Sequence, residues 1–220
     1  QVNLTGYGDV TPTVLDVTID AGETSTGNDF IDELGRIAGN VKSDDDDNGT
    51  GDLPLENVTV ELLDRNGNVI ATTTTDSDGN YEFSDVTPGN YRVKQTNLTG
   101  YGDVTPTVLD VTIGAGETDT GNDFIDELGR IAGNVKSDDN NDNIGDTDLE
   151  NVTVELLDSN GDVIATTTTN TLGIYEFDSL LPGDYQVRQV NLAGYGDVTP
   201  TVLDVTIGAG ESETCKDYVD

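Results

Sequence analysis

Oxygen-bearing side chains with the spacing of metal ligands fill an acidic loop at residues 43–54. Alternate positions point side chains toward the inside of a tightly curved loop, and Gly49 permits the sharp bend. Glu56 follows closely enough to complete a coordination shell. Oxygen ligands in this arrangement suit Ca²⁺, so the loop predicts a calcium site. Its ligands would be Asp44, Asp46, Asn48, Asp52 and Glu56.

A second loop carries oxygen at the same offsets, although the residue types change. Its ligands would be Asp138, Asn140, Asp142, Asp146 and Glu150. Asn143 replaces the glycine, and asparagine accepts left-handed backbone angles. The alternative for both loops is a solvated acidic run. Coordination is favoured, because five carboxylates within residues 43–52 are costly to hold together without a cation.

A third acidic pair, Asp76 and Asp78 before Gly79, is a further candidate for calcium. The corresponding residues of the other copy are Asn170 and Leu172, which carry no carboxylate. A plain turn is therefore the alternative at this position.

The charge of the chain limits its partners. It has 44 acidic and 9 basic residues in 220, a formal net charge of -35. Such a charge destabilises a compact state unless cations or salt offset it. We expect no nucleic-acid partner, because no basic patch could neutralise phosphates. We expect no membrane insertion either, because no apolar run is long enough to span a bilayer.

Enzymatic chemistry is not expected. The chain has no histidine, which excludes Ser-His and Cys-His nucleophile pairs. The dense carboxylate clusters lie in loops with metal-ligand spacing. The single cysteine, Cys215, cannot form an intrachain disulfide; it either pairs between chains or is a neutral substitution.

The elements that position these loops belong to an internal repeat. The segment GYGDVTPTVLDVTI recurs with its tyrosine at Tyr7, Tyr101 and Tyr195, 94 residues apart each time. This period predicts two complete domains, 35–128 and 129–220. Residues 1–34 would then hold the C-terminal strands of an incomplete repeat.

Each repeat reads as a series of short strands. Residues 57–64 alternate Val58, Val60 and Leu62 with polar side chains, which is typical of a half-buried strand. Further strands are expected at 37–42, 69–75, 81–83, 91–95, 108–113 and around Phe124. The pattern predicts an all-β chain of immunoglobulin-like β-sandwich domains joined end to end. The short junction at 126–129 predicts a stiff connection.

Several of these segments are similar to a known family. GRIAGNVKSDDDDNG, the run TTTTDSDGNYEF and the following PGNYRV resemble the B-type repeats of serine-aspartate repeat surface adhesins. More broadly they resemble collagen-adhesin B-type domains of prealbumin-like fold. The resemblance covers the whole chain and implies extracellular stalk or scaffold modules that need calcium for rigidity. Some collagen-adhesin domains use a glutamate to promote an isopeptide bond, but Gln95 and Gln189 stand there in this chain.

Other features concern modification and assembly. N-glycosylation sequons begin at Asn3, Asn48, Asn57, Asn97 and Asn151, and they predict N-glycans at Asn3, Asn57, Asn97 and Asn151. The partial repeat would expose open strand edges. It would be completed by preceding residues of the same chain or by strand donation from a neighbouring chain.

The sequence therefore predicts a structural repeat of an extracellular filament, stalk or surface-adhesin array, rigidified by calcium. Self-assembly into a filament or a continuous tandem array would be its main interaction. The alternative is a ligand- or carbohydrate-binding adhesin module.

Overall fold

A computed structural model describes residues 1–220, and all of its regular elements are strands. Residues 1–34 contain β1 (Gly8–Asp9) and β2 (Asp32–Glu33). Residues 35–128 contain β3 (Gly35–Ser43), β4 (Leu53–Pro54), β5 (Thr59–Leu63), β6 (Val69–Thr74), β7 (Asn80–Val86), β8 (Gly89–Thr96), β9 (Gly102–Asp103), β10 (Val108–Ile113), β11 (Thr118–Asp119) and β12 (Phe124–Glu127). Residues 129–220 contain β13 (Gly129–Ser137), β14 (Thr147–Asp148), β15 (Thr153–Leu157), β16 (Val163–Thr168), β17 (Ile174–Leu180), β18 (Gly183–Val190), β19 (Val202–Ile207), β20 (Ser212–Glu213) and β21 (Tyr218–Val219). No helix of a length and apolarity that could cross a membrane is present.

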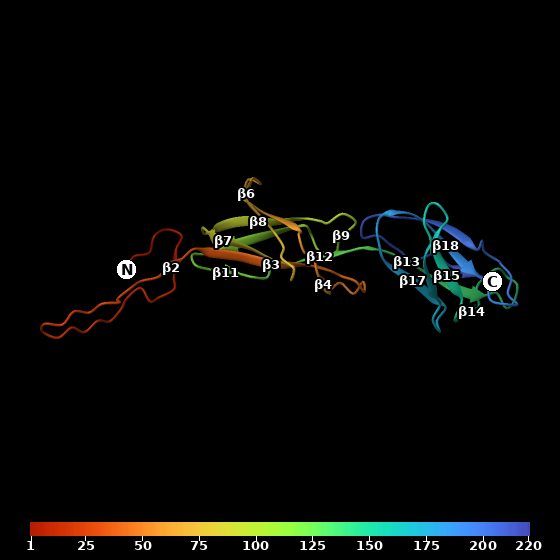
Figure 1. Cartoon of the computed structure of the whole chain (residues 1–220), viewed down its shortest axis with the longest axis horizontal. Helices are drawn as coiled ribbons and strands as arrows, with labels where there is room; N and C mark the ends of the chain where they lie inside the picture. The colour runs from red at the N-terminus through yellow and green to blue at the C-terminus, as the bar shows by residue number, and fades with distance from the viewer. The chain divides into compact units, whose positions relative to one another are not determined.

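The second repeat, drawn from green to blue in Figure 1, has two sheets. In one sheet β13 pairs antiparallel with β14 and β17, and parallel with β20 and β21. In the other sheet the order is β16-β15-β18-β19, and every pair is antiparallel. The first repeat has the same four-stranded arrangement, β6-β5-β8-β10, and β3 again pairs antiparallel with β7 and parallel with β11. The predicted all-β sandwich fold is therefore confirmed.

The core of each sandwich follows from period-2 alternation. In β15, Val154 and Leu156 are buried while Glu155 between them is half-exposed. Burying each such side chain contributes about 1.5–3 kcal/mol. The buried cluster of the second repeat consists of Ile131, Val135, Leu149, Val152, Val154, Leu156, Tyr175, Phe177, Val187, Val205, Ile207 and Tyr218.

A close approach between strands explains one glycine of β13. A Cβ atom at Gly133 would lie 2.1 Å from the carbonyl oxygen of Lys216 and 2.7 Å from the hydroxyl oxygen of Tyr175. That hydroxyl donates a hydrogen bond to the same Lys216 carbonyl. Gly39 has an equivalent role beside Tyr81, whose hydroxyl donates to the carbonyl oxygen of Asn122. Only glycine fits where backbone and tyrosine meet this closely.

Residues 1–34 repeat the sequence of 95–128 but do not bury the same side chains. Val17, Ile19 and Phe30 are 44%, 56% and 40% exposed. Their counterparts Val111, Ile113 and Phe124 are 4%, 2% and 0% exposed. Burial of these positions therefore depends on the remaining strands of a repeat.

The chain divides into two compact units. One comprises residues 1–42, 54–96 and 105–124, and the other comprises 43–53, 97–104 and 125–220. The limits drawn from the repeat, 1–34, 35–128 and 129–220, stay a prediction. Cys215 is exposed and forms no disulfide within the chain.

Candidate metal centre

Each acidic loop connects two antiparallel strands of its repeat. The first runs from the end of β3 to β4 and is closed by the Asp52 amide, which donates to the Ser43 carbonyl at 2.7 Å. The second runs from β13 to β14 and is closed by the Asp146 amide, which donates to the Ser137 carbonyl, also at 2.7 Å. The two sequences differ, so the shared closure comes from the backbone.

The first aspartate of each loop holds the bend from inside. The Asp44 carboxylate accepts hydrogen bonds from the Asn48 and Gly49 amides at 3.1 and 2.6 Å. Asp138 accepts the equivalent bonds from Asp142 and Asn143 at 3.1 and 2.8 Å. Gly49 and Asn143 both have positive φ, 81° and 66°, as the bend requires.

The last aspartate of each loop binds back to its beginning. Asp52 accepts a hydrogen bond from the Asp45 amide, and Asp146 accepts one from the Asp139 amide, both at 3.0 Å. The first and last aspartates of each loop are thus both held by hydrogen bonds from the backbone. This arrangement fixes the carboxylates before any ion binds.

The first loop brings three predicted ligands together. One carboxylate oxygen each from Asp44, Asp46 and Asp52 lies within 4.8 Å of the other two. Ca²⁺ takes oxygen ligands at about 2.3–2.6 Å, so a group of oxygens with this spread can surround one ion. Without a cation, two unit charges at this distance repel by about 1 kcal/mol in water and several times more in a less polar setting.

The second loop places an amide where the first has a carboxylate. The Asn140 side-chain nitrogen donates to Asp142 at 3.2 Å and to Asp146 at 3.5 Å, while its oxygen accepts from the Asp142 amide. If the distant glutamate is left aside, each loop has four predicted ligands, three carboxylates and one amide. The amide is Asn48 in the first loop and Asn140 in the second. The residue types thus suit a hard divalent cation in both loops, but only the first loop gathers three carboxylates, because in the second the Asn140 nitrogen faces Asp142 and Asp146.

The remaining predicted ligands lie outside this group. Glu56 and Glu150 are exposed and follow β4 and β14, and neither belongs to the carboxylates that the structure gathers. Asp76 accepts hydrogen bonds from the Asp78 and Asn80 amides at 2.9 and 2.8 Å, which makes a turn. Asn170 makes the same turn through the Leu172 and Ile174 amides, so this turn needs no metal. Calcium at Asp76 and Asp78 stays a prediction without a gathered ligand set.

The sequence did not indicate the bracing residues. Ser43 donates to Asp45, and Ser137 donates to Asp139, each at 2.8 Å. Thr147 adds a further hydrogen bond to Asp139 at 2.7 Å, and these hydroxyl donors hold the pKa of Asp139 below its ordinary value. One signal in the sequence could have indicated them. Asp45 and Asp139 alternate with the predicted ligands, so they face away from the ligand group and are free to accept these hydroxyls.

Both sandwiches, each with one oxygen-rich loop, define a tandem β-sandwich repeat protein. A family model described as SdrD B-like domain matches residues 35–123 and 129–210. The chain belongs to this family. Serine-aspartate repeat proteins are surface adhesins, which places the chain outside the cell, at the cell surface.

Curated relatives support the assignment over most of the chain. Serine-aspartate repeat-containing protein D of Staphylococcus aureus (strain Newman) is 36% identical over 181 residues, which cover 72% of this chain and 13% of that protein. Serine-aspartate repeat-containing protein F of Staphylococcus epidermidis is 34% identical over 175 residues, 71% of this chain and 10% of that protein. The chain thus spans a small part of the length of these relatives.

Solved structures with a similar chain course include two from other bacteria. "The Bacillus anthracis TIE protein" aligns with a TM-score of 0.46 at 20% identity, covering 84% of this chain and 34% of that chain. The shaft pilin SpaA from Lactobacillus rhamnosus GG aligns with a TM-score of 0.36 at 13% identity, covering 84% of this chain and 96% of that chain.

Proposed function

We propose that the chain is a structural segment of an extracellular stalk, filament or surface-adhesin array, and that Ca²⁺ rigidifies it at one loop per repeat. The observation that supports calcium is the pair of loops. Different sequences bend both loops through matching hydrogen bonds from backbone amides to Asp44 and Asp138, and the first loop gathers carboxylates of Asp44, Asp46 and Asp52. A loop selected only for charge would not need to keep this geometry.

Calcium would join the two ends of the first acidic loop. The ligands come from the end of β3 and from the residues before β4, so one ion would tie both ends of an exposed loop. Binding to the folded state alone stabilises it by mass action, by about 2.7 kcal/mol when the ion is at 100 times its dissociation constant.

Assembly as a continuous tandem array is favoured over strand donation. Phe124 and Tyr218, on the last strands of the two complete repeats, are both 0% exposed. In each complete repeat the repeat's own last strand thus occupies this position, and a strand donated by another chain would have to displace that strand. Light scattering across a range of concentrations tests this. A concentration-dependent oligomer that disappears when residues 1–34 are deleted would favour donation instead.

Glycosylation is most compatible with the fold at two of the four predicted asparagines. Asn57 and Asn151 are exposed. Asn97 is partly buried and its side-chain nitrogen donates to Asp103 at 2.6 Å, while that of Asn3 donates to the Tyr7 carbonyl at 3.5 Å. We propose that Asn57 and Asn151 carry the glycans of the folded chain, which glycopeptide mass spectrometry of native material would test.

Calcium titration of paired variants tests the central proposal. The substitutions Asp44→Asn and Asp52→Asn remove two ligand charges but keep oxygen acceptors for the backbone amides. We expect the first site to weaken at least 100-fold, because a calcium site depends on ligand charge. Asp47→Asn is the matched control, since Asn141 occupies this position in the second loop.

The expected result for the control is an affinity within about threefold of the parent chain, because Asp47 is not among the gathered ligands. The corresponding pair in the second loop is Asp138→Asn with Asp146→Asn. The calcium proposal fails if the parent chain binds no Ca²⁺, or if Asp47→Asn weakens binding as much as the ligand pair does.

A further inference from the structure

Two arginines of the first repeat lack the ion pairs that most basic residues of the chain have. Ion pairs within 4.0 Å engage six of the nine basic residues, namely Arg36, Lys94, Arg130, Lys136, Arg188 and Lys216. Arg65 and Arg92 have no carboxylate within this distance. In a chain with 44 acidic residues, two guanidinium groups without such a partner are an unusual local excess of positive charge.

Both arginines line one shallow depression of about 220 Å³. Arg65 lies on the turn between β5 and β6, which Asp64 fixes by accepting the Asn66 and Asn68 amides at 2.8 and 2.9 Å. Arg92 lies on β8, and a Cβ atom at Gly67 would be 2.9 Å from its guanidinium nitrogen. The Arg92 side chain therefore reaches the turn that carries Arg65.

The other lining groups complement an acidic ligand that also carries hydroxyls. The Asn90 oxygen accepts a hydrogen bond from Thr112 at 2.9 Å, which leaves its side-chain nitrogen as a donor. Asp110, opposite Arg92 in the sheet, supplies an acceptor. Tyr91 lies between Asn90 and Arg92 on β8, so its ring points to the opposite face of the sheet, where its hydroxyl donates to the Thr87 carbonyl at 2.8 Å.

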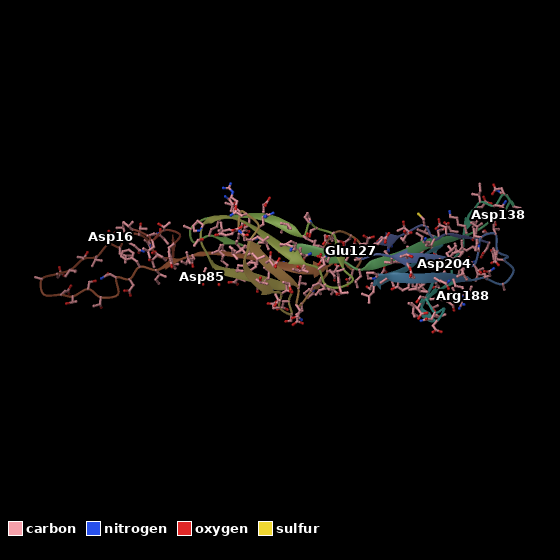
Figure 2. The ribbon with its side chains drawn as sticks, turned by 90° about the horizontal axis from the view of Figure 1, so that it is seen from above. Asp16, Asp85, Glu127, Asp138, Arg188 and Asp204 are labelled. Atoms are coloured by element: carbon pink, nitrogen blue, oxygen red, sulfur yellow. The ribbon has the colours of Figure 1, made fainter.

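The second repeat offers an internal comparison with the charge reversed. Its equivalent depression, of about 260 Å³, keeps Tyr185 and Asp204. The positions of the two arginines are Ser159 and Gln186, and Asn90 is replaced by Asp184. Gln186 on β18 donates a hydrogen bond at 2.8 Å to Asp204 on the neighbouring strand β19. Asp204 is labelled in Figure 2.

The lining of the first repeat has two arginines and one aspartate, a net formal charge of +1. The lining of the second repeat has two aspartates and no basic residue, a net formal charge of -2. The backbone register is the same, since Arg92 lies opposite Asp110 on the neighbouring strand, as Gln186 lies opposite Asp204. Two nearly identical repeats thus differ together at three positions of one surface feature. This combined difference points to a ligand of the first repeat.

We propose that this depression binds a sugar residue that carries a carboxylate or sulfate group. The planar guanidinium groups of Arg65 and Arg92 suit a bidentate oxyanion. Asn90 and Asp110 pair with ring hydroxyls, which an inorganic anion does not have. The size of the depression fits one sugar ring. A ligand this small is expected to bind with a dissociation constant of about 1 mM.

The test uses the whole chain, labelled with ¹⁵N, at an ionic strength of about 0.15 M, where distant acidic groups are largely screened. Glucuronate, glucose 6-sulfate, inorganic sulfate and glucose are the four probes. We expect glucuronate or glucose 6-sulfate to shift amide signals at residues 65–68, 89–92 and 110–112. Inorganic sulfate and glucose are expected to bind at least five times more weakly.

Variants exchange the lining between repeats. Arg65→Ser, Asn90→Asp and Arg92→Gln together give the first repeat the lining of the second, and we expect binding to weaken at least tenfold. Ser159→Arg, Asp184→Asn and Gln186→Arg should create a second site at 183–186 and 204–206. Both sets use residues that the same backbone already carries in the other repeat, so folding is retained.

Three results would overturn the proposal. One is the absence of localised shifts with either acidic sugar. Another is unchanged binding after the three substitutions in the first repeat. The third is equal binding of glucose, which would assign recognition to ring shape rather than to the two arginines.

Discussion

At the scale of single residues, neighbouring aspartates of the acidic loop differ in their hydrogen-bond partners and therefore in their roles. Asp44 and Asp52 bind the backbone and face the ligand group, whereas Asp45 binds Ser43. Sequence spacing predicted the ligand positions Asp44, Asp46 and Asp52, which the structure gathers. It could not predict the bracing contacts, because whether a hydroxyl two positions away (Ser43) or eight positions away (Thr147) reaches a carboxylate depends on the turn that forms.

Replacing Gly133 with alanine should destabilise the second repeat. The new Cβ atom would meet the Lys216 carbonyl at 2.1 Å, so strands must move apart, at a cost of about 1–3 kcal/mol in the free energy of unfolding. Denaturant unfolding of the chain measures this. The control is Gly121→Ala, where no atom lies within 4 Å of the added Cβ. Equal effects of the two substitutions would contradict the assigned close approach.

Asp178 adds to the pH dependence of the second repeat a contribution that has no counterpart in the first. Burial raises the pKa of Asp178 to about 6, with Glu176 nearby adding to the effect and Arg130, 3.2 Å away, opposing it. A folded pKa above the unfolded one favours the folded state at low pH. This stability is fully present below the unfolded pKa of about 3.8 and is lost as the pH rises through about 6.

The matched substitution is Asp178→Ser, since Ser84 occupies the position in the first repeat. Because the carboxylate is partly exposed, screening limits the effect to about 1 kcal/mol. We expect the parent chain to lose about this much free energy of unfolding between pH 4 and pH 7 relative to the variant. Identical pH profiles would show that Asp178 titrates normally.

At the scale of elements, alternation predicted the long strands and missed the shortest ones. The strand expected at 57–64 appears as β5, and that expected at 108–113 appears as β10. The segment expected at 81–83 is longer, since β7 spans Asn80–Val86. Two-residue strands such as β9 and β11 carry too few positions for a periodic pattern, and their pairing depends on distant strands.

The loop, rather than any single ligand, should determine calcium affinity. Exchanging two neighbours through Asp46→Asn and Asn48→Asp gives the first loop the ligand order of the second. We expect the affinity of the first site to change less than about threefold, because the number of ligand charges is unchanged. Calorimetric titration in a background with Asp138→Asn and Asp146→Asn isolates this site.

The contrasting variant for this prediction is Asp46→Asn alone, which removes one charge. We expect it to weaken binding about tenfold. If the exchanged pair weakens binding as strongly as the single change, the position of each ligand matters more than the total charge.

At the scale of the whole molecule, Figure 2 shows red side-chain oxygens along the length of the chain, in keeping with the net charge of -35. The opposing cations are few, and most of them pair within their own repeat. Repulsion of this size lowers stability whenever the neutralising ions are removed. The proposed calcium sites lie in loops where carboxylates are crowded together.

Chelation should therefore lower the melting temperature of the whole chain. We expect a fall of at least about 5 °C in a calcium chelator, because folded-state binding and charge neutralisation are both lost. Added sodium chloride should restore part of this by screening, whereas Mg²⁺ should restore less than Ca²⁺ because it prefers a smaller octahedral site. Melts followed by circular dichroism measure both effects. An unchanged melting temperature would contradict the role of calcium.

The parallel pairing of β13 with β21 has a mechanical consequence. These are the first and last strands of the second repeat, and Val135 and Lys136 lie opposite Tyr218 and Val219. Tension applied to the two ends of the repeat pulls these strands past one another, so their hydrogen bonds bear the load together in shear instead of opening one after another. Resistance to force is set by the rate of unfolding. The second repeat is thus suited to transmit tension along a chain while it remains folded.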